Sequence, residues 1–175
     1  MVVSCSDQET EPVISNTPNQ PEIQHTSTAI VFSDESPART LLLHHRRLNR
    51  WQPPGGHQKP HELPHETAIR ETREETGLDI EPYFDTPVRL DDRARSLPLP
   101  RYILEEQIAA YNEHPAHIHI DMVFVVTIPH ETPILSPDEA LEIGWFTLEA
   151  MRDLQLFENV RMTLEELFAE RIHRG

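Results

Sequence analysis

Hydrophobic residues gather in short blocks between polar, proline-containing stretches, and the spacing within each block indicates its secondary structure. Residues 25–33 (HTSTAIVFS) are apolar and β-branched, residues 34–39 supply turn formers, and an extended pattern resumes at Thr40. These segments predict a β-hairpin, because such residues favour strands and turn formers separate them. Residues 117–128 (HIHIDMVFVVTI) alternate at first and then become continuously apolar, which predicts the clearest strand of the chain, central in a sheet.

A helical pattern covers about residues 64–76, and Gly77 follows it as glycine commonly follows a helix end. Further strands are expected at residues 78–84 and 143–146, a short helix at 103–111, a loop or insertion at 86–101, and two helices between 147 and 173. Strands interleaved with helices predict an α/β fold in which helices cover both faces of one sheet.

The first 23 residues are rich in polar residues and proline, and this composition predicts a disordered tail before a single domain at residues 24–175. The net charge of −15 argues against nonspecific nucleic-acid binding and implies that an anionic substrate would need bound cations. Cys5 is the only cysteine, so an internal disulfide is excluded. We expect a cytoplasmic protein without a membrane span, because the apolar runs are short and the start lacks the basic and apolar regions of a secretory signal.

Three glutamates share one face of the helix predicted at residues 64–76. Glu71, Glu74 and Glu75 stand at positions i, i+3 and i+4, so their carboxylates project close together. Like-charge repulsion destabilises such a cluster, and a hard divalent cation such as Mg²⁺ would relieve it. The alternative is an acidic helix face that is only solvated.

The surroundings of this helix favour the metal-binding interpretation. Three of the five glycines of the chain, Gly55, Gly56 and Gly77, bracket it. A double glycine allows the backbone to approach a metal closely. Arg70 precedes Glu74 by four residues and can orient its carboxylate by pairing.

The stretch from Gly56 to Leu78 resembles the Nudix box. This pattern consists of a glycine, then a glutamate, then the segment Arg-Glu-aliphatic-any-Glu-Glu-any-Gly-aliphatic, all at fixed spacing. The matching positions are Gly56, Glu62, Arg70, Glu71, Thr72, Glu74, Glu75, Gly77 and Leu78, and the spacing is intact. Thr72 departs from the pattern, because an aliphatic residue is usual there. Eight fixed positions over this length make a chance match negligible compared with a short motif.

The resemblance implies a Nudix-like α/β/α sandwich with a mixed sheet and the activity of a Nudix-type pyrophosphohydrolase. Glu71, Glu74 and Glu75 would bind Mg²⁺ or Mn²⁺ together with a main-chain carbonyl of Gly55 or Gly56. Glu62 would lie in the layer of residues around these ligands without binding the metal itself. The expected reaction is attack of a metal-activated water on a diphosphate linkage in a nucleoside diphosphate derivative or related small molecule.

Three further residue roles follow as expectations of this resemblance. Glu71 or Glu74 is the first choice for the general base, and Glu139 on a later loop is the alternative. Arg70 would act catalytically by orienting a carboxylate.

Candidate substrate-binding residues lie outside the box and carry a weaker signal. They are Arg46, Arg47 and Arg50 for phosphate, Trp51 for stacking on a base, and His119 on the strand at 117–128. For the arginines a solvated loop is the alternative.

A competing metal site is suggested by His117, His119 and Asp121, which alternate on that strand and share a face. The segment resembles part of the metallo-β-lactamase pattern His-x-His-x-Asp-His, but Met122 occupies the final histidine position. His44, His45, His57 and His65 are dispersed enough that solvated positions are expected for them.

Two other functions stay open at this point. A noncatalytic nucleotide-binding Nudix module would be expected to lack at least one box carboxylate. An isoprenyl diphosphate isomerase-like enzyme would need a catalytic cysteine, and Cys5 lies in the predicted tail. The substrate is undetermined, because residues 92–95, where a proline or tyrosine would mark ADP-ribose or dinucleoside polyphosphate hydrolases, are Asp-Arg-Ala-Arg. A homodimer is a further open arrangement.

Overall fold

The computed structural model describes residues 21–174, which include every candidate site residue. Strand β1 (Glu22–Ser33) begins ahead of the predicted domain start at residue 24. The rest of the predicted tail, including Cys5, lies outside the described residues. No helix within residues 21–174 is long and apolar enough to cross a membrane.

The described strands form one mixed seven-stranded sheet with the order β3-β2-β1-β6-β5, in which β4 also pairs with β1 and β7 with β2. The further strands are β2 (Thr40–His45), β3 (Arg50–Gln52), β4 (Gly55–His57), β5 (Tyr102–Ile108), β6 (His117–Ile128) and β7 (Ala140–Phe146). Only β1 and β6 pair in parallel, and the predicted hairpin is present as the antiparallel pair β1 and β2. Strand β6 is interior as predicted, because β1 and β5 flank it.

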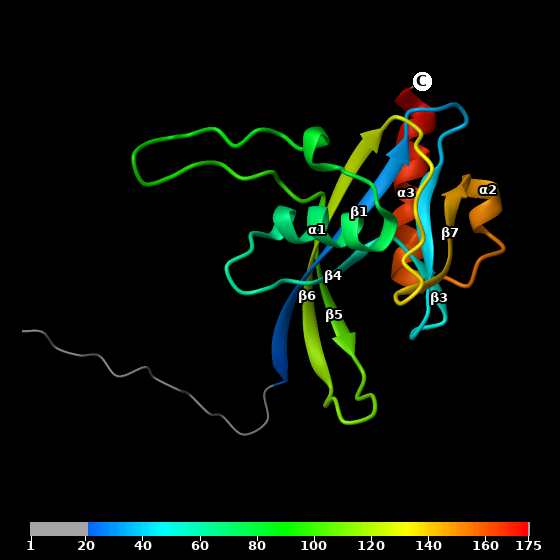
Figure 1. The fold of residues 1–175 in the computed structure, drawn as a ribbon, viewed down its shortest axis with the longest axis horizontal. Helices are drawn as coiled ribbons and strands as arrows, with labels where there is room; N and C mark the ends of the chain where they lie inside the picture. The colour runs from blue at the N-terminus through cyan, green and yellow to red at the C-terminus, as the bar shows by residue number, and fades with distance from the viewer. Residues whose placement is uncertain (1–20, 175) are drawn as a thin grey trace, which may run out of the picture.

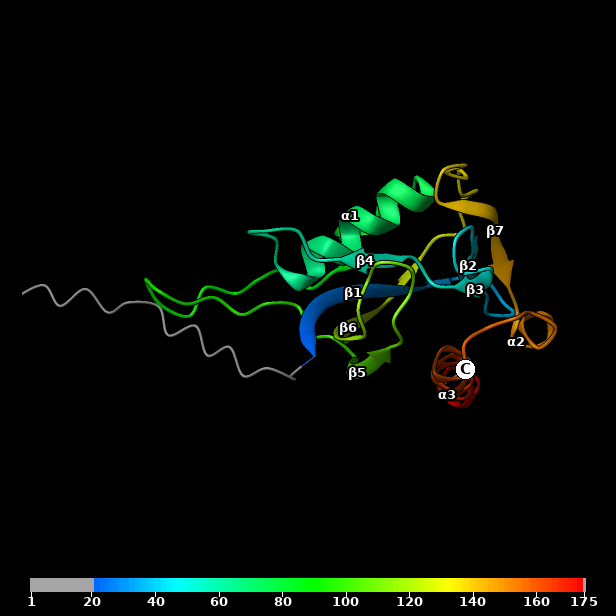
Figure 2. The same ribbon diagram turned by 90° about the horizontal axis from the view of Figure 1, so that it is seen from below.

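Helices cover both faces of this sheet, as Figure 2 shows for α1 (Pro64–Thr76) on one side and α3 (Glu158–Arg174) on the other. Alternating residues of β1 supply the two cores: Ala29 and Val31 pack with α1, while Ile30 and Phe32 pack with α3. The expected α/β/α sandwich with a mixed sheet is therefore confirmed.

The C-terminal part contains the two predicted helices. The first, α2 (Leu148–Met151), is a single turn whose N-cap Thr147 accepts a hydrogen bond from Ala150 N. The second, α3, lies along the sheet, and its buried Leu164, Leu167 and Phe168 form much of the second core.

The predicted strand at residues 78–84 is wrong, because this segment forms a short 3₁₀ helix, η1 (Glu81–Tyr83). Leu78 and Ile80 are buried in alternation like strand residues, yet the segment pairs with no strand. Pro82 cannot donate to a ladder, and the Asp79 carboxylate accepts a hydrogen bond from Glu81 N at 3.2 Å, which favours a turn.

The predicted helix at residues 103–111 is also wrong, because its first six residues belong to strand β5. All seven residues of β5 pair with β6, from Tyr102 opposite Val123 to Ile108 opposite His117. Tertiary pairing therefore overrides the helical propensity of this leucine- and glutamate-containing segment.

The long connection from η1 to β5 is a loop as predicted, and it extends well beyond the sheet (Figure 1). A short turn closes its tip, where Leu90 and Asp91 each donate a backbone hydrogen bond to Ala94 O.

Candidate active site

Local sequence fixes both ends of α1, which carries the acidic residues. Pro64 occupies the first turn, where a missing N–H costs nothing, and the Glu66 carboxylate accepts a hydrogen bond from Leu63 N at 2.8 Å. Gly77 ends the helix with a left-handed φ of 71°, and its N–H donates to Arg73 O at 3.0 Å. These contacts fix both ends of the helix, so Glu71, Glu74 and Glu75 all lie within it.

The buried side of α1 sets which way these carboxylates point. Ala68, Ile69, Thr72 and Thr76 are buried against the sheet, as the helical spacing predicts. Thr72, the one departure from the box pattern, is fully buried, and its hydroxyl donates to Ala68 O at 2.8 Å. The buried hydroxyl of Thr72 therefore has a hydrogen-bond partner within the helix.

The Gly55-Gly56 strand lies directly against Glu71 and Glu75. Gly55 N donates to Glu75 Oε2 at 3.0 Å, and a Cβ added to Gly56 would stand 2.6 Å from the Glu71 carboxylate. Only a residue without a side chain fits at Gly56 without moving Glu71. Glu74 differs from these two, because about half of its side chain is exposed.

Glu75 is a buried acid in an electronegative setting. It is 4% exposed. Desolvation raises the pKa of its carboxyl to about 8, the Gly55 N–H opposes this shift, and the charges of Glu71, Glu139 and Glu74 add to it. A cation placed among these groups would favour the ionised form of Glu75.

Arg70 connects the acidic groups through a fork of hydrogen bonds. Its Nε and Nη2 bind the two oxygens of Glu62 at 2.6 and 2.9 Å, and its Nη1 binds Glu71 at 2.7 Å and Glu74 at 2.9 Å. Nη2 also donates to His57 O at 3.0 Å. Arg70 thus fixes the direction of the Glu71 and Glu74 carboxylates, and Glu62 in turn holds the Arg70 guanidinium in place.

Glu62 gives a stability prediction that depends on pH. The hydrogen bonds from Arg70 lower the pKa of Glu62 from 4.5 to about 2, so ionised Glu62 stabilises the fold fully above pH 4.5 and loses this effect as the pH falls toward 2. We expect Glu62→Gln to lower the free energy of unfolding by about 1–3 kcal/mol at neutral pH, since it weakens a charged hydrogen-bond pair.

Denaturant unfolding of both proteins between pH 7 and pH 2 checks this. The difference between wild type and Glu62→Gln should shrink below pH 4.5. The exposed Glu105→Gln is the matched control and should follow wild type throughout. A difference that stayed constant with pH would contradict the Arg70 pairing.

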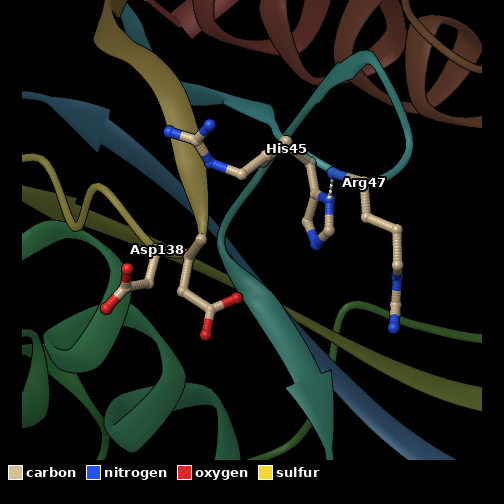
Figure 3. A pocket seen from close by; sticks show the side chains of 5 residues that line it. His45, Arg47 and Asp138 are labelled. Carbon is tan, nitrogen blue, oxygen red and sulfur yellow. Dashed lines mark hydrogen bonds between the residues drawn. The ribbon is translucent and has the colours of Figure 1, made fainter.

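A small pocket adjoins the acidic cluster, between the β2-β3 turn and the segment before β7 (Figure 3). Its volume is about 240 Å³, and it is lined by His45, Arg46, Arg47, Asp138 and Glu139. The charge of Glu139 acts on both Glu75 and His45, which places the pocket beside the carboxylates of α1. Arg46 is thus brought to this region, with its Nε donating to Pro137 O at 3.0 Å.

The structure does not bring Trp51 to this site. Trp51 lies in the core on the α3 face of the sheet, 9% exposed, with its ring 4.9 Å from that of Phe146. The proposed stacking of Trp51 on a base is therefore not supported, because packing already covers the ring. Arg50 binds Gln155 Oε1 at 3.3 Å and lies over the ring of Phe157, so it too is engaged with the segment leading into α3.

The strand histidines meet a residue that the sequence did not single out. His119 Nε2 lies 3.1 Å from His117 Nε2, and the ring of His57 packs edge-on against His119 at 4.9 Å. Asp121 is buried and accepts a hydrogen bond from Thr26 at 2.9 Å, and the cluster of ligand atoms found on this strand contains His57 in place of Asp121, so the His-x-His-x-Asp trio does not assemble as one site. His57 is exposed, as expected, but its contact with His119 was not predicted; its position next to the double glycine is the only sequence signal that could have linked it to β6.

His45 and His65 also differ from the solvated positions expected for them. His65 is buried at 8% exposure, and His45 is half-buried in the pocket of Figure 3. Burial lowers the pKa of both imidazoles, with Arg47 adding to the shift at His45.

Comparison with known proteins agrees with this geometry. The family model described as NUDIX domain matches residues 23–167. A segment of 32 residues is 56% identical to the mouse (Mus musculus) asymmetrical bis(5'-nucleosyl)-tetraphosphatase, covering 18% of this chain and 22% of that relative. The chain therefore matches only about a fifth of the length of that relative.

Solved structures show the same fold over most of the chain. A NUDIX-family hydrolase from Clostridium perfringens aligns with a TM-score of 0.63 and 22% identity, covering 83% of this chain and 96% of the other. A C. elegans Ap4A hydrolase aligns with a TM-score of 0.58 and 19% identity, covering 86% and 98%. These structures share the fold, and because the family model spans most of its length, this chain belongs to the Nudix family.

Proposed function

We propose that this protein hydrolyses a diphosphate linkage in a nucleoside diphosphate derivative and that it depends on Mg²⁺ or Mn²⁺. The observation that carries the proposal is the convergence of the Glu71 and Glu75 carboxylates on the Gly55-Gly56 backbone. A noncatalytic module that binds no metal would have no need of this close approach.

The donor set fits a hard divalent cation. It consists of carboxylate oxygens with main-chain carbonyls nearby, which suits Mg²⁺ or Mn²⁺ and not a soft metal. Arg70 takes one oxygen of Glu71, and Glu75 is a buried acid whose pKa is raised by desolvation and its acidic neighbours. Glu71, Glu74 and Glu75, with a carbonyl of Gly55 or Gly56, would hold the ion. When bound, it would neutralise the phosphates and lower the pKa of a water molecule.

The protein's own groups have separate roles in this proposal. Glu71 or Glu74 accepts the proton of the attacking water, and Arg70 orients both through its hydrogen bonds. Glu139 is the alternative base, because its charge reaches Glu75. Arg46 and Arg47 in the adjoining pocket bind phosphate oxygens, which offsets the repulsion that the negative net charge of the chain imposes on an anionic substrate.

Dinucleoside polyphosphates are the first substrate class to test, because the mouse relative and the C. elegans neighbour carry that activity in their names. The tyrosine that marks such enzymes is absent at residues 92–95, and these residues lie on the long loop before β5. Nucleotide sugars, ADP-ribose and nucleoside triphosphates therefore belong in the same panel.

The test measures phosphate and nucleotide release from each compound with Mg²⁺, with Mn²⁺ and with chelator. We expect release from one compound class that requires metal and stops with chelator. Release that continues in chelator would overturn metal dependence. No release from any compound, together with nucleotide binding by calorimetry, would instead favour a noncatalytic Nudix module.

A further inference from the structure

Three histidines gather on the sheet, and one of them directly follows the Gly55-Gly56 segment. His57 comes from β4, and His117 and His119 come from the start of β6. One ligand atom from each lies within 4.8 Å of the others. Nothing in the proposed hydrolysis uses these side chains.

The cluster lies on the sheet face opposite α1. In β6 the odd-numbered Val123 and Val125 pack on the α3 side, so alternation turns His117 and His119 to that side as well. In β4 a side chain at Gly56 would point at Glu71 on α1, so the next residue, His57, points the other way. The histidines and the α1 carboxylates therefore form two separate sets of ligands that share strand β4.

The distances suit a single transition-metal ion. Zinc binds imidazole nitrogen at about 2.0–2.1 Å in a tetrahedral site, which puts two ligand nitrogens about 3.3–3.4 Å apart. The Nε2 atoms of His117 and His119 are already 3.1 Å apart. The ligand atoms of all three residues lie within 4.8 Å of one another, so rotations of the side chains would be required to direct the three lone pairs at one ion.

In two of the three histidines, His57 and His117, one ring nitrogen is hydrogen-bonded to a carbonyl oxygen, as is usual for histidines that bind a metal through the other nitrogen. His117 Nδ1 donates to Pro115 O at 2.9 Å, which leaves the lone pair on Nε2, facing His119. His57 Nε2 donates to the Gln24 amide oxygen at 2.9 Å, which leaves its lone pair on Nδ1. A carbonyl partner of this kind fixes the tautomer and direction of a ligand.

His119 completes the set by a change of tautomer. With His117 Nε2 as the acceptor, His119 Nε2 is assigned as the donor of this hydrogen bond, and its proton would have to shift to Nδ1 for Nε2 to bind a metal. Neutral imidazole is the form that binds metals.

We propose that His57, His117 and His119 together bind one zinc-like transition-metal ion that fastens β4 to β6, separately from the Mg²⁺-type site on α1. Imidazole ligands select such metals over Mg²⁺, which prefers oxygen. Three protein ligands leave a fourth position for water or an external donor. The proposal does not depend on hydrolytic activity.

The first experiment titrates the metal-free full chain with Zn²⁺ in excess Mg²⁺, so that the carboxylate site is already occupied. We expect one Zn²⁺ per chain and a rise in the melting temperature, since the ion binds the folded state. Co²⁺ in place of Zn²⁺ should give the strong visible absorption of four-coordinate cobalt with nitrogen ligands. No zinc binding by wild type under these conditions would overturn the proposal without any mutant.

Three variants locate the bound ion. His119→Gln should weaken Zn²⁺ binding more than about 100-fold, because loss of even an outer partner of a ligand typically costs 10–100-fold. His25→Gln is the matched control, since His25 is exposed on β1 and its neighbour Gln24 pairs with His119. Glu71→Gln tests the other site and should leave zinc affinity unchanged. Zinc binding lost in Glu71→Gln but kept in His119→Gln would place the ion on α1 and refute the histidine site.

Discussion

Glu74→Gln is expected to retain the fold and to reduce metal-dependent turnover by about 10²- to 10⁴-fold, the range for loss of a positioned proton acceptor. The fold should survive because the Glu74 side chain is about half exposed and one of its two ion-pair partners, Lys59, is also exposed. Arg70 keeps its bonds to Glu62 and Glu71 in the variant. Steady-state turnover at saturating Mg²⁺ is the measurement.

Glu66→Gln is the matched control for this prediction. Glu66 is exposed on the same helix and caps it by accepting a hydrogen bond from Leu63 N. Glutamine can make the same capping bond, so Glu66→Gln should keep both fold and turnover. If Glu74→Gln retained full activity, Glu74 would be neither base nor essential metal ligand. The same assay on Glu71→Gln would then identify the remaining candidate.

Gly56→Ala is expected to give the second largest effect, a loss of metal affinity in a protein that still folds. The added Cβ would meet the Glu71 carboxylate at 2.6 Å, and this carboxylate is the far end of a flexible side chain. Glu71 can therefore swing away, which relieves the clash but removes a ligand from its place beside Gly55 and Gly56. We expect Mn²⁺ binding to weaken by about tenfold or more, as for disturbed ligand positioning in other metal sites.

Variants at two other glycines serve as comparisons for Gly56→Ala. At Gly144 in β7 an added Cβ would make an ordinary contact of 3.4 Å with Phe146, so Gly144→Ala should bind Mn²⁺ like wild type. At Gly55 the Cβ would lie 2.8 Å from Ser27 O and 2.9 Å from Thr28 Cα, which are backbone atoms. Gly55→Val should therefore displace β4 itself, impairing metal binding and lowering stability. Unchanged Mn²⁺ affinity in Gly56→Ala would show that Glu71 is not a ligand there.

The sequence determined the helix of the site and its chemistry because that information is local. Helical spacing alone places Glu71, Glu74 and Glu75 together, Gly77 ends the helix, and Arg70 reaches Glu74 one turn away. The apolar strand patterns at residues 25–33 and 117–128, interleaved with helical patterns, likewise predicted a sheet with helices on both faces. These patterns depend on neighbours within a few residues, so no knowledge of the fold is needed to interpret them.

Tertiary structure decided every feature that rests on distant partners. β5 is a strand because β6 lies beside it, despite a local preference for helix, and Trp51 is core because the segment before α3 covers it. His57 reaches His117 and His119 only because β4 and β6 pair with the same strand, β1. The residues paired between β1 and β4 are about 30 positions apart in the chain and those paired between β1 and β6 are 95 apart, and the free energy of such pairing is not encoded in either segment alone.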